Sequence, residues 1–385
     1  MIFQANGSNY DLSQSLRLLF SRGTQKDSDE LRSLLASRYG GQATLFSKGR
    51  GALSEAVRVS GAKVTAVNGY TCSVVVEAIT SAGSTPKYLD IDPTAAHFSA
   101  KTLGKAIEQT PEVGAVIVQN TYGIPCDIAG IEALAKKHNL ILIEDLAHSI
   151  GQTYLDGREV GTVGDVTMLS FGRDKMIDVG SGGALIVRNP RFDEKVAVPD
   201  ALSPKKLQRQ DRWYPILSWL VRAFYPVKLG RFLLGAMFRM HWVSRSSDGG
   251  IHREYTLPHW QARQAARLFK TLDSTVALRH QKSAAYASLL NLPLAERASI
   301  RVPFVVDDPS AVLGSCKRRH FMLDDIWYDT PIGPKRKYAD FAFPEADCPE
   351  AVKFAHHVIN LPTHQFVTRA DQAKLTQIIA EEKRV

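Results

Sequence analysis

The stretch that decides the fold runs from Ile141 to Val187 and reads ILIEDLAHSIGQTYLDGREVGTVGDVTMLSFGRDKMIDVGSGGALIV. Three short apolar runs, rich in β-branched residues, are bounded there by Gly, Asp or Asn: Leu140–Ile143, Val166–Phe171 and Ala184–Val187. Runs of this kind are typical of strands that are buried on both faces. We therefore expect three strands in this region.

The same rhythm recurs upstream of that stretch. Strands are expected at Val64–Val67, Lys87–Leu89 and Ala115–Val118, and helices at Ser73–Ala82 and Ile128–His138. Strands and helices that alternate at these intervals form crossover units around a parallel sheet with helices on both faces. The sequence therefore predicts an α/β fold with a mostly parallel sheet.

Polar side chains follow the predicted strands, at the edge where such sheets bind ligands. Asp145, Ser170 and Asn120 fall at this edge, and Lys175 comes five residues after Ser170. A lysine amine can hold a cofactor aldehyde as a Schiff base, and a carboxylate beside a pyridine nitrogen keeps that ring protonated. Asp145 and Lys175 therefore suggest pyridoxal phosphate chemistry; the alternative for an isolated lysine is a solvated surface position.

Several ordered motifs resemble the PLP-dependent sugar aminotransferases of the DegT/StrS group, which have the aspartate aminotransferase-like fold type I. EDLAHSIG, SFGRDK and GSGGALIV match an acidic strand end, Ser-Phe-x-x-x-Lys and Gly-x-Gly-Gly. Further matching segments are Lys48–Gly61, Thr121–His138, CPEA near Cys348 and NLPTH near Asn360. The resemblance covers most of the chain except roughly residues 191–250.

This resemblance implies two domains. The large PLP-binding domain, residues 1–250, has the mostly parallel central sheet and includes a basic, aromatic-rich insertion at about residues 191–250. A smaller α+β C-terminal domain follows in residues 251–385, with one helix from His259 to Ala287 as the bridge. A chain of 385 residues, 44% of them hydrophobic, is long enough for both.

The resemblance also assigns roles to three catalytic residues. Lys175 is expected to hold the cofactor covalently and later to move the proton between substrate and cofactor carbons. Asp145 is expected to pair with the pyridine nitrogen. His148 is expected to lie against the ring or its phenolic oxygen, and the alternative for it is a structural histidine in the core.

The remaining cofactor contacts are expected from other strand and helix ends. Ser170 is expected to donate its hydroxyl to the phosphate, together with the backbone amides of Gly49, Arg50 and Gly51 at a helix start, where unpaired amides and the helix dipole favour an anion. The Arg50 side chain either adds a charge-assisted contact or points away. Tyr70 matches the place of a residue that lies over the ring.

The resemblance implies that the protein moves an amino group from an amino acid, glutamate, to a keto-sugar. This reaction would serve the biosynthesis of a surface polysaccharide or glycoconjugate, and the resemblance also implies that the enzyme is a homodimer. The acceptor is nucleotide- or lipid-linked. One alternative is a PLP enzyme for a non-sugar ketone or for sugar dehydration, although dehydrating members tend to have His where Lys175 stands. Another alternative is a non-catalytic regulatory or scaffold protein. The family has the motif Asn-Tyr-Arg-Met where this chain has Glu254–Leu257, and this difference allows a loss of activity. Arg253 or His252 could replace the Asn and Arg side chains of the motif.

The segment Lys205–Arg245 departs most from the family. It has nine basic residues and one acidic residue, Asp211, so its net charge of +8 nearly equals the +9 of the whole chain. Trp and Phe interleave with the charges, and no stretch reaches the about twenty apolar residues that span a bilayer. The pattern fits interfacial helices on an anionic membrane, or a helical hairpin packed on the neighbouring domain or subunit. No nucleic-acid motif appears, so no nucleic-acid partner is expected.

The cysteines and the N-terminal residues bear on location. Four scattered cysteines, Cys72, Cys126, Cys316 and Cys348, favour free thiols over a metal site or a disulfide framework. MIFQANGSNYD lacks the basic segment and apolar core of a signal peptide. We expect a cytoplasmic protein, with peripheral contact at the inner membrane face if residues 205–245 bind lipid.

Overall fold

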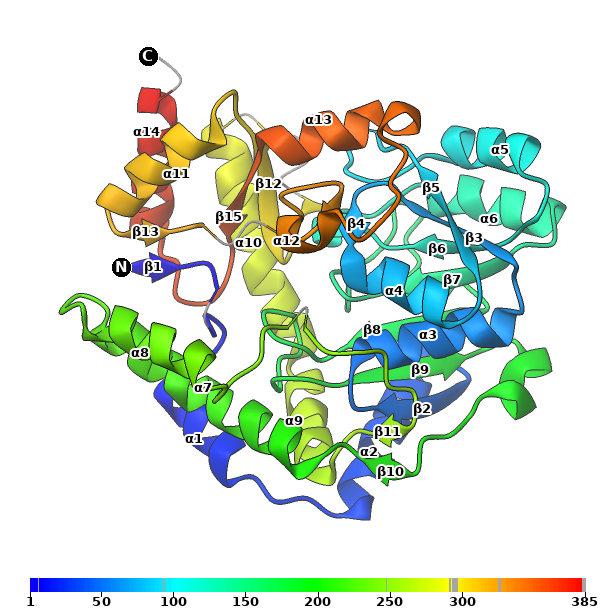
Figure 1. Cartoon of the computed structure of the whole chain (residues 1–385), viewed down its shortest axis with the longest axis horizontal. Coiled ribbons are helices and arrows are strands. Elements are labelled where there is room, and N and C mark those ends of the chain that lie inside the picture. Colours follow the sequence, from blue (N-terminus) through cyan, green and yellow to red (C-terminus); the bar gives the residue numbers. More distant parts are fainter. Residues whose placement is uncertain are drawn as a thin grey trace.

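The computed structural model describes residues 1–5, 7–92, 94–246, 248–290, 292, 297–324 and 327–382. Its centre is a seven-stranded sheet (Figure 1). In spatial order the strands are β2 (Gln42–Phe46), β9 (Gly183–Val187), β8 (Val166–Ser170), β7 (Ile141–Asp145), β6 (Val113–Val118), β3 (Val64–Asn68) and β5 (Thr85–Leu89). β9 is antiparallel to both neighbours and the other pairs are parallel. The predicted α/β fold with a mostly parallel sheet is confirmed, whereas the edge strand β2 was not predicted.

Helices cover both faces of this sheet (Figure 1). They are α2 (Gln25–Tyr39), α3 (Gly49–Ser60), α4 (Ser73–Ser81), α5 (Ala100–Gln109) and α6 (Ile128–Lys137). Successive side chains of a strand point to opposite faces, so Ile141 and Ile143 pack in one apolar cluster with α3 and α4, and Leu142 packs in another with α2, α5 and α6. The same alternation sends Glu144 and Asp145 to opposite faces.

A second apolar core lies beside the sheet. Its elements are β12 (Arg301–Val305), β15 (Val358–Pro362), α10 (Leu272–Leu290), α11 (Pro309–Arg318), α13 (Pro349–His357) and α14 (Arg369–Glu382). β12 and β15 pair antiparallel. Helix α10 places Leu272 and Val276 in the first core and Tyr286 in the second, so it connects the two.

The expected bridge from His259 to Ala287 is two helices rather than one. α9 (His259–Phe269) ends at Lys270 and packs in the first core, and α10 begins at Leu272. The Thr271 hydroxyl donates to the Leu268 carbonyl at 3.1 Å, a local bond that competes with the helix ladder and favours a bend. The division at residue 250 stays a prediction.

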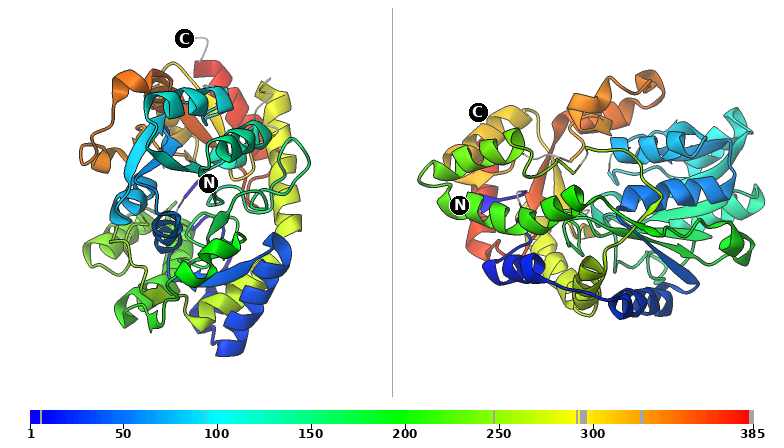
Figure 2. Two further views of the ribbon diagram at one scale, coloured as in Figure 1. Left: turned by 90° about the vertical axis from the view of Figure 1, so that its right-hand side faces the viewer. Right: turned by 60° about the horizontal axis from the view of Figure 1, so that its bottom comes forward.

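The segment that departs from the family forms α7 (Lys205–Phe224) and α8 (Leu229–Arg239) at one end of the molecule (Figure 2). Helix α7 packs against α1 (Leu12–Phe20), and α8 packs against α7. Tyr214, Val221 and Met237 of the two helices are buried in the first core. Arg212 donates to the carbonyls of Leu19 and Ser21 at 2.9 and 2.7 Å. The inner side of α7 is therefore an integral part of the fold, as in a packed hairpin.

Among the described residues, no helix has both the length and the apolar character needed to cross a bilayer. The shorter elements are β1 (Ile2–Phe3), β4 (Thr71–Cys72), β10 (Ala201–Leu202), β11 (Tyr255–Thr256), β13 (Phe321–Met322), β14 (Ile332–Gly333) and α12 (Lys335–Tyr338).

Candidate active site

Asp145 ends β7 at the carboxyl edge of the sheet, where it is 1% exposed. One carboxylate oxygen, Oδ1, accepts a hydrogen bond from the Ala147 amide at 2.9 Å. Burial raises the pKa of Asp145 to about 6, although the Ala147 amide and the Lys175 amine oppose this shift. The carboxylate therefore sits in a low-dielectric site where a cationic partner stabilises it strongly.

Lys175 lies in the loop between β8 and β9, and this loop is held by two residues. Asn9 donates through Nδ2 to the Lys175 carbonyl at 3.1 Å and to the Asp178 carboxylate at 3.1 Å. Asp178 also accepts from the amides of Asp174 and Gly180, at 2.8 and 3.1 Å. Burial lowers the pKa of the Lys175 amine to about 8. About a tenth of the amine is then uncharged and nucleophilic at pH 7, far more than for an ordinary exposed lysine.

His148 is buried and has a defined hydrogen-bonding pattern. Its Nδ1 accepts from the Tyr122 amide at 3.2 Å, and its Nε2 lies 3.2 Å from the Tyr328 hydroxyl. An imidazole nitrogen that accepts from an amide carries no proton, so the neutral tautomer has its proton on Nε2. Burial, helped by the positive charges of Lys175 and Arg301, lowers the His148 pKa well below 6.5.

Two residues from the second core complete the site and were not predicted from the sequence. The Trp327 ring stacks on the His148 ring, with centroids 4.4 Å apart and planes 16° apart. The Lys175 Nζ lies 4.4 Å from the Trp327 ring centroid, and the Arg301 guanidinium carbon lies 3.9 Å from it. The one available signal was Arg301, a charged residue in an otherwise apolar strand.

The start of α3 forms a tight cradle against the ends of β8 and β9. A Cβ on Gly49 would lie 3.0 Å from the Ser170 Cβ and 3.1 Å from its hydroxyl oxygen, and one on Gly183 would lie 2.5 Å from the Gly49 Cα. The first amides of a helix lack intrahelical acceptors. Gly49 therefore lies against Ser170 at the helix start, while the Gly51 amide donates to the Lys48 carbonyl at 3.1 Å. The contacts of Ser170, Gly49, Arg50 and Gly51 with a phosphate stay a prediction.

The Arg50 side chain points away from the helix start, which is one of its two expected orientations. Its guanidinium donates to the carbonyls of Ser246, Asp248 and Gly249, the last at 2.7 Å. It therefore stabilises the loop that precedes β11, and of Arg50 only the backbone amide belongs to the cradle.

Tyr70 lies in the same buried cluster as His148. Its hydroxyl is 2.6 Å from the Tyr122 hydroxyl, and its ring packs edge-on against Tyr328 at 5.3 Å. Since Tyr122 donates its amide to His148, Tyr70 supports the wall of the site. Its contact with a cofactor stays a prediction.

The segment that departs from the Asn-Tyr-Arg-Met pattern packs beside the cradle. A Cβ on Gly51 would lie 2.5 Å from the His252 carbonyl oxygen. His252 pairs through Nδ1 with Glu254 at 2.9 Å, and Arg253 lies 3.9 Å from Glu55. Both candidate replacements for the lost side chains thus have acidic neighbours within the chain.

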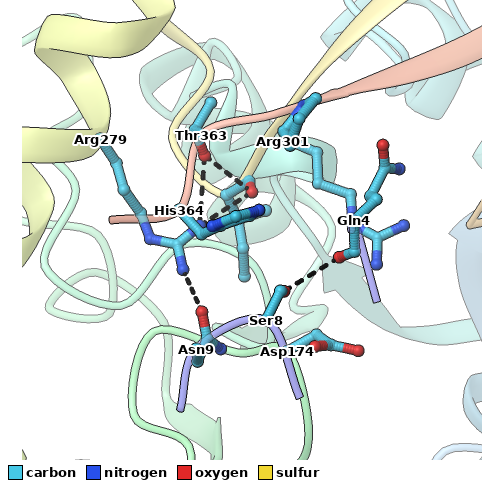
Figure 3. Close-up of a pocket in the computed structure, with 10 residues that line it drawn as sticks. Gln4, Ser8, Asn9, Asp174, Arg279, Arg301, Thr363 and His364 are labelled. Carbon is cyan, nitrogen blue, oxygen red and sulfur yellow. Dashed lines mark hydrogen bonds between the residues drawn. The ribbon is translucent and has the colours of Figure 1, made fainter. Parts of the chain in front are cut away.

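A small cavity of about 10 Å³, room for about one water molecule, lies beside the Lys175 loop. Figure 3 shows Asp174, Asn9, Arg279 and Arg301 around it, with Arg279 bonded to Asn9. Asn9 therefore connects α10 to the loop that carries Lys175. The N-terminal segment is part of the scaffold of the site.

The model of the DegT/DnrJ/EryC1/StrS aminotransferase family matches residues 40–380. The chain belongs to this family. It is 30% identical over 192 residues to the spore coat polysaccharide biosynthesis protein SpsC of Bacillus subtilis, covering 50% of this chain and 48% of that protein. It is 36% identical over 129 residues to a UDP-N-acetyl-3-dehydro-alpha-D-glucosamine 3-aminotransferase of Acidithiobacillus ferrooxidans, covering 33% of this chain and 34% of that one. The matches thus span about half or less of these curated relatives.

A putative sugar aminotransferase of Streptococcus pneumoniae, solved in its PMP form, has the same fold with a TM-score of 0.74. The identity is 17%, and the alignment covers 100% of this chain and 99% of that one. This member of the DegT/DnrJ/EryC1/StrS family therefore has fold type I, as predicted.

The cofactor of this family is pyridoxal phosphate, and the residues present fit it. Lys175 supplies a buried amine of lowered pKa for its aldehyde, and Asp145 supplies a buried carboxylate that suits a pyridinium N–H. The cradle at Gly49 and Ser170, which leaves no room for a Cβ on Gly49, suits a phosphate.

Proposed function

We propose that this protein is a pyridoxal phosphate-dependent aminotransferase that moves an amino group from an amino acid, glutamate, to a keto-sugar. The observation that carries the proposal is the buried Lys175 amine, whose pKa is lowered, close to Asp145 and His148. Two relatives named above support a sugar acceptor and a role in polysaccharide biosynthesis, since their names specify a UDP-sugar substrate and spore coat polysaccharide. The acceptor is accordingly a nucleotide- or lipid-linked keto-sugar.

Lys175 has two tasks in this reaction. As a neutral amine it would hold the cofactor aldehyde, and once released it would accept the proton from the substrate carbon and return it to the cofactor carbon. Both tasks need an amine that exchanges protons near neutral pH, and burial provides this by lowering the pKa to about 8. The hydrogen bonds of Asn9 and Asp178 hold the loop that positions it.

Asp145 and His148 set the charges around the cofactor ring in this proposal. When bound, pyridoxal phosphate supplies the electron sink for the substrate carbon. Asp145 holds a proton on the pyridine nitrogen, since a buried carboxylate favours a cationic partner. His148 is held neutral by burial and by the Tyr122 amide, so it presents a ring face without adding positive charge.

The lowered pKa of Lys175 predicts a pH dependence. Only the unprotonated amine attacks an aldehyde, so the rate of covalent cofactor attachment should rise with pH and level off above about 8. The measurement is the initial rate at which the visible absorption band of Lys175-bound cofactor appears. A rate that still rises tenfold per pH unit above about pH 9, as expected for an exposed lysine, contradicts the proposed environment.

The proposal includes a homodimer in the cytoplasm and a peripheral contact with an anionic membrane. The family resemblance supports the dimer, and the outer side of α8 supports the membrane contact. There Leu229 and Phe232 are 54% and 75% exposed next to Lys228, Arg231 and Arg239. Apolar and basic side chains on one exposed helix face bind anionic lipid surfaces.

Replacing Lys228, Arg231 and Arg239 by Ser should weaken binding to phosphatidylglycerol vesicles. At about 1 kcal/mol per cation, the loss is roughly 100-fold in affinity, measured by vesicle sedimentation. The matched control replaces Lys105, Lys136 and Lys137 of α5 and α6, at the other end of the molecule (Figure 1). Equal losses in both variants, or no vesicle binding by the unmodified protein, contradict the membrane contact. Deleting α7 is unsuitable because its inner side is buried in the core.

A further inference from the structure

Trp327 lies at the centre of the site, although neither the family motifs nor the proposed chemistry gives it a role. Its ring stacks on His148 at a centroid distance of 4.4 Å and lies 4.4 Å from the Lys175 amine. Its third neighbour is the guanidinium of Arg301, at 3.9 Å. An aromatic ring stacked on His148 and next to Lys175 is the arrangement expected of the cofactor ring itself.

The indole and the cofactor ring cannot share this place. Stacked or edge-on aromatic rings have centroids about 4.5–7 Å apart. The indole is already at stacking distance from the His148 ring and occupies the position next to that face. The aldehyde carbon that would bond to Lys175 is attached directly to the cofactor ring, so the ring would lie two covalent bonds from Nζ and against His148. Protein interiors are close-packed, and a second ring has no room there while the indole stays.

The main chain of Trp327 is held by a hydrogen bond, and rotation of the side chain alone can move the ring. The Trp327 amide donates to Asn360 Oδ1 at 2.9 Å, and Asn360 donates through Nδ2 to the Tyr122 hydroxyl at 3.1 Å. The next residue, Tyr328, is held at His148 Nε2. The indole is only partly buried, so rotation about its side-chain bonds can carry it out of the stack.

We propose that Trp327 is a side-chain gate on Lys175. Its indole holds the place of the cofactor ring on His148 and covers the amine, and it has to rotate away before the cofactor aldehyde reaches Lys175. This inference deepens the proposed function and rests on it, because it concerns the same site. The gate lowers the apparent affinity for the cofactor by the fraction of molecules in which the indole has left.

The test compares the full-length protein, stripped of cofactor, with the variants Trp327→Ala and Trp327→Leu. Trp213→Ala is the matched control, since Trp213 is a tryptophan of α7 that is 46% exposed. The first readout is the rate at which trinitrobenzenesulfonate labels Lys175, followed by peptide mass spectrometry. The second is the dissociation constant for pyridoxal phosphate, from the visible band. Trp327→Leu keeps an apolar side chain and guards against misfolding of the alanine variant.

We expect both Trp327 variants to label at least about tenfold faster and to bind pyridoxal phosphate about tenfold more tightly, with Trp213→Ala unchanged. Unchanged labelling, or equal or weaker cofactor binding than the unmodified protein, overturns the gate. If labelling rises but no protein forms the visible band, the indole does cover Lys175 and the proposed function fails instead. If labelling is unchanged while the unmodified protein binds the cofactor, the gate fails and the proposed function stands.

Discussion

Lys175→Ala should abolish amino transfer, with a loss of at least about 10⁴-fold, because one substitution removes both the covalent attachment and the proton carrier. Lys175 reaches the site from a loop whose order depends on Asn9 and Asp178, and neither contact involves its amine. The fold should therefore survive, and the visible band of covalently held cofactor should be absent. The measurements are amino transfer from glutamate, the absorption spectrum and circular dichroism.

The matched control is Lys282→Ala. Lys282 is also largely buried, with a pKa that burial lowers to about 8, but it donates to the His364 carbonyl at 2.7 Å from α10. Its replacement should reduce stability and leave the visible band in place. If the Lys175→Ala protein retains turnover, or if Lys282→Ala alone loses the band, Lys175 is not the residue that holds the cofactor.

Asp145→Asn is expected to have the second largest effect. Removing one partner of a buried charge pair costs about 3–5 kcal/mol, which is roughly a 100- to 5,000-fold loss in kcat. Asparagine is similar in size and can still accept from the Ala147 amide, so the site keeps its shape while the pyridine nitrogen loses its carboxylate. Covalent attachment at Lys175 should persist, which separates this variant from Lys175→Ala.

Glu144→Gln is the control for Asp145→Asn. Glu144 is the adjacent buried carboxylate on the opposite face of β7, where it accepts from the amides of Gly161, Val163 and Gly164. Its replacement should lower the free energy of unfolding and change kcat little. An Asp145→Asn protein with kcat close to that of the unmodified enzyme contradicts the role of the carboxylate.

Local sequence patterns were sufficient for six of the seven strands of the sheet. The buried strands β7, β8 and β9 contain continuous apolar runs, so composition alone located them, and Asp145 followed as a polar residue at the end of one of them. β2 was not predicted because it is an edge strand that begins with a polar, exposed residue. The break between α9 and α10 was not predicted because the residues there show no glycine or proline; the local feature at the break is the hydrogen bond of the Thr271 hydroxyl.

The site was only partly predictable for a different reason. Lys175, Asp145 and Ser170 lie within about thirty residues of one another, and their spacing carries the family pattern. Trp327 and Arg301 reach the site from the second core, so their positions depend on how the two cores pack. Arg50 has the right place in the chain, but its guanidinium is drawn to three carbonyls of a distant loop. The residues around Arg50 give no information on where that loop lies, so the orientation of its side chain could not be predicted from the sequence.

The measurement that tests the central claim most directly is borohydride reduction of the protein after incubation with pyridoxal phosphate, followed by peptide mass spectrometry. Reduction fixes the cofactor to whichever amine holds it. The account predicts a single phosphopyridoxyl group on Lys175, and loss of that label when glutamate is added before reduction. A folded protein that carries no label, or a label spread over surface lysines and absent from Lys175, would contradict it.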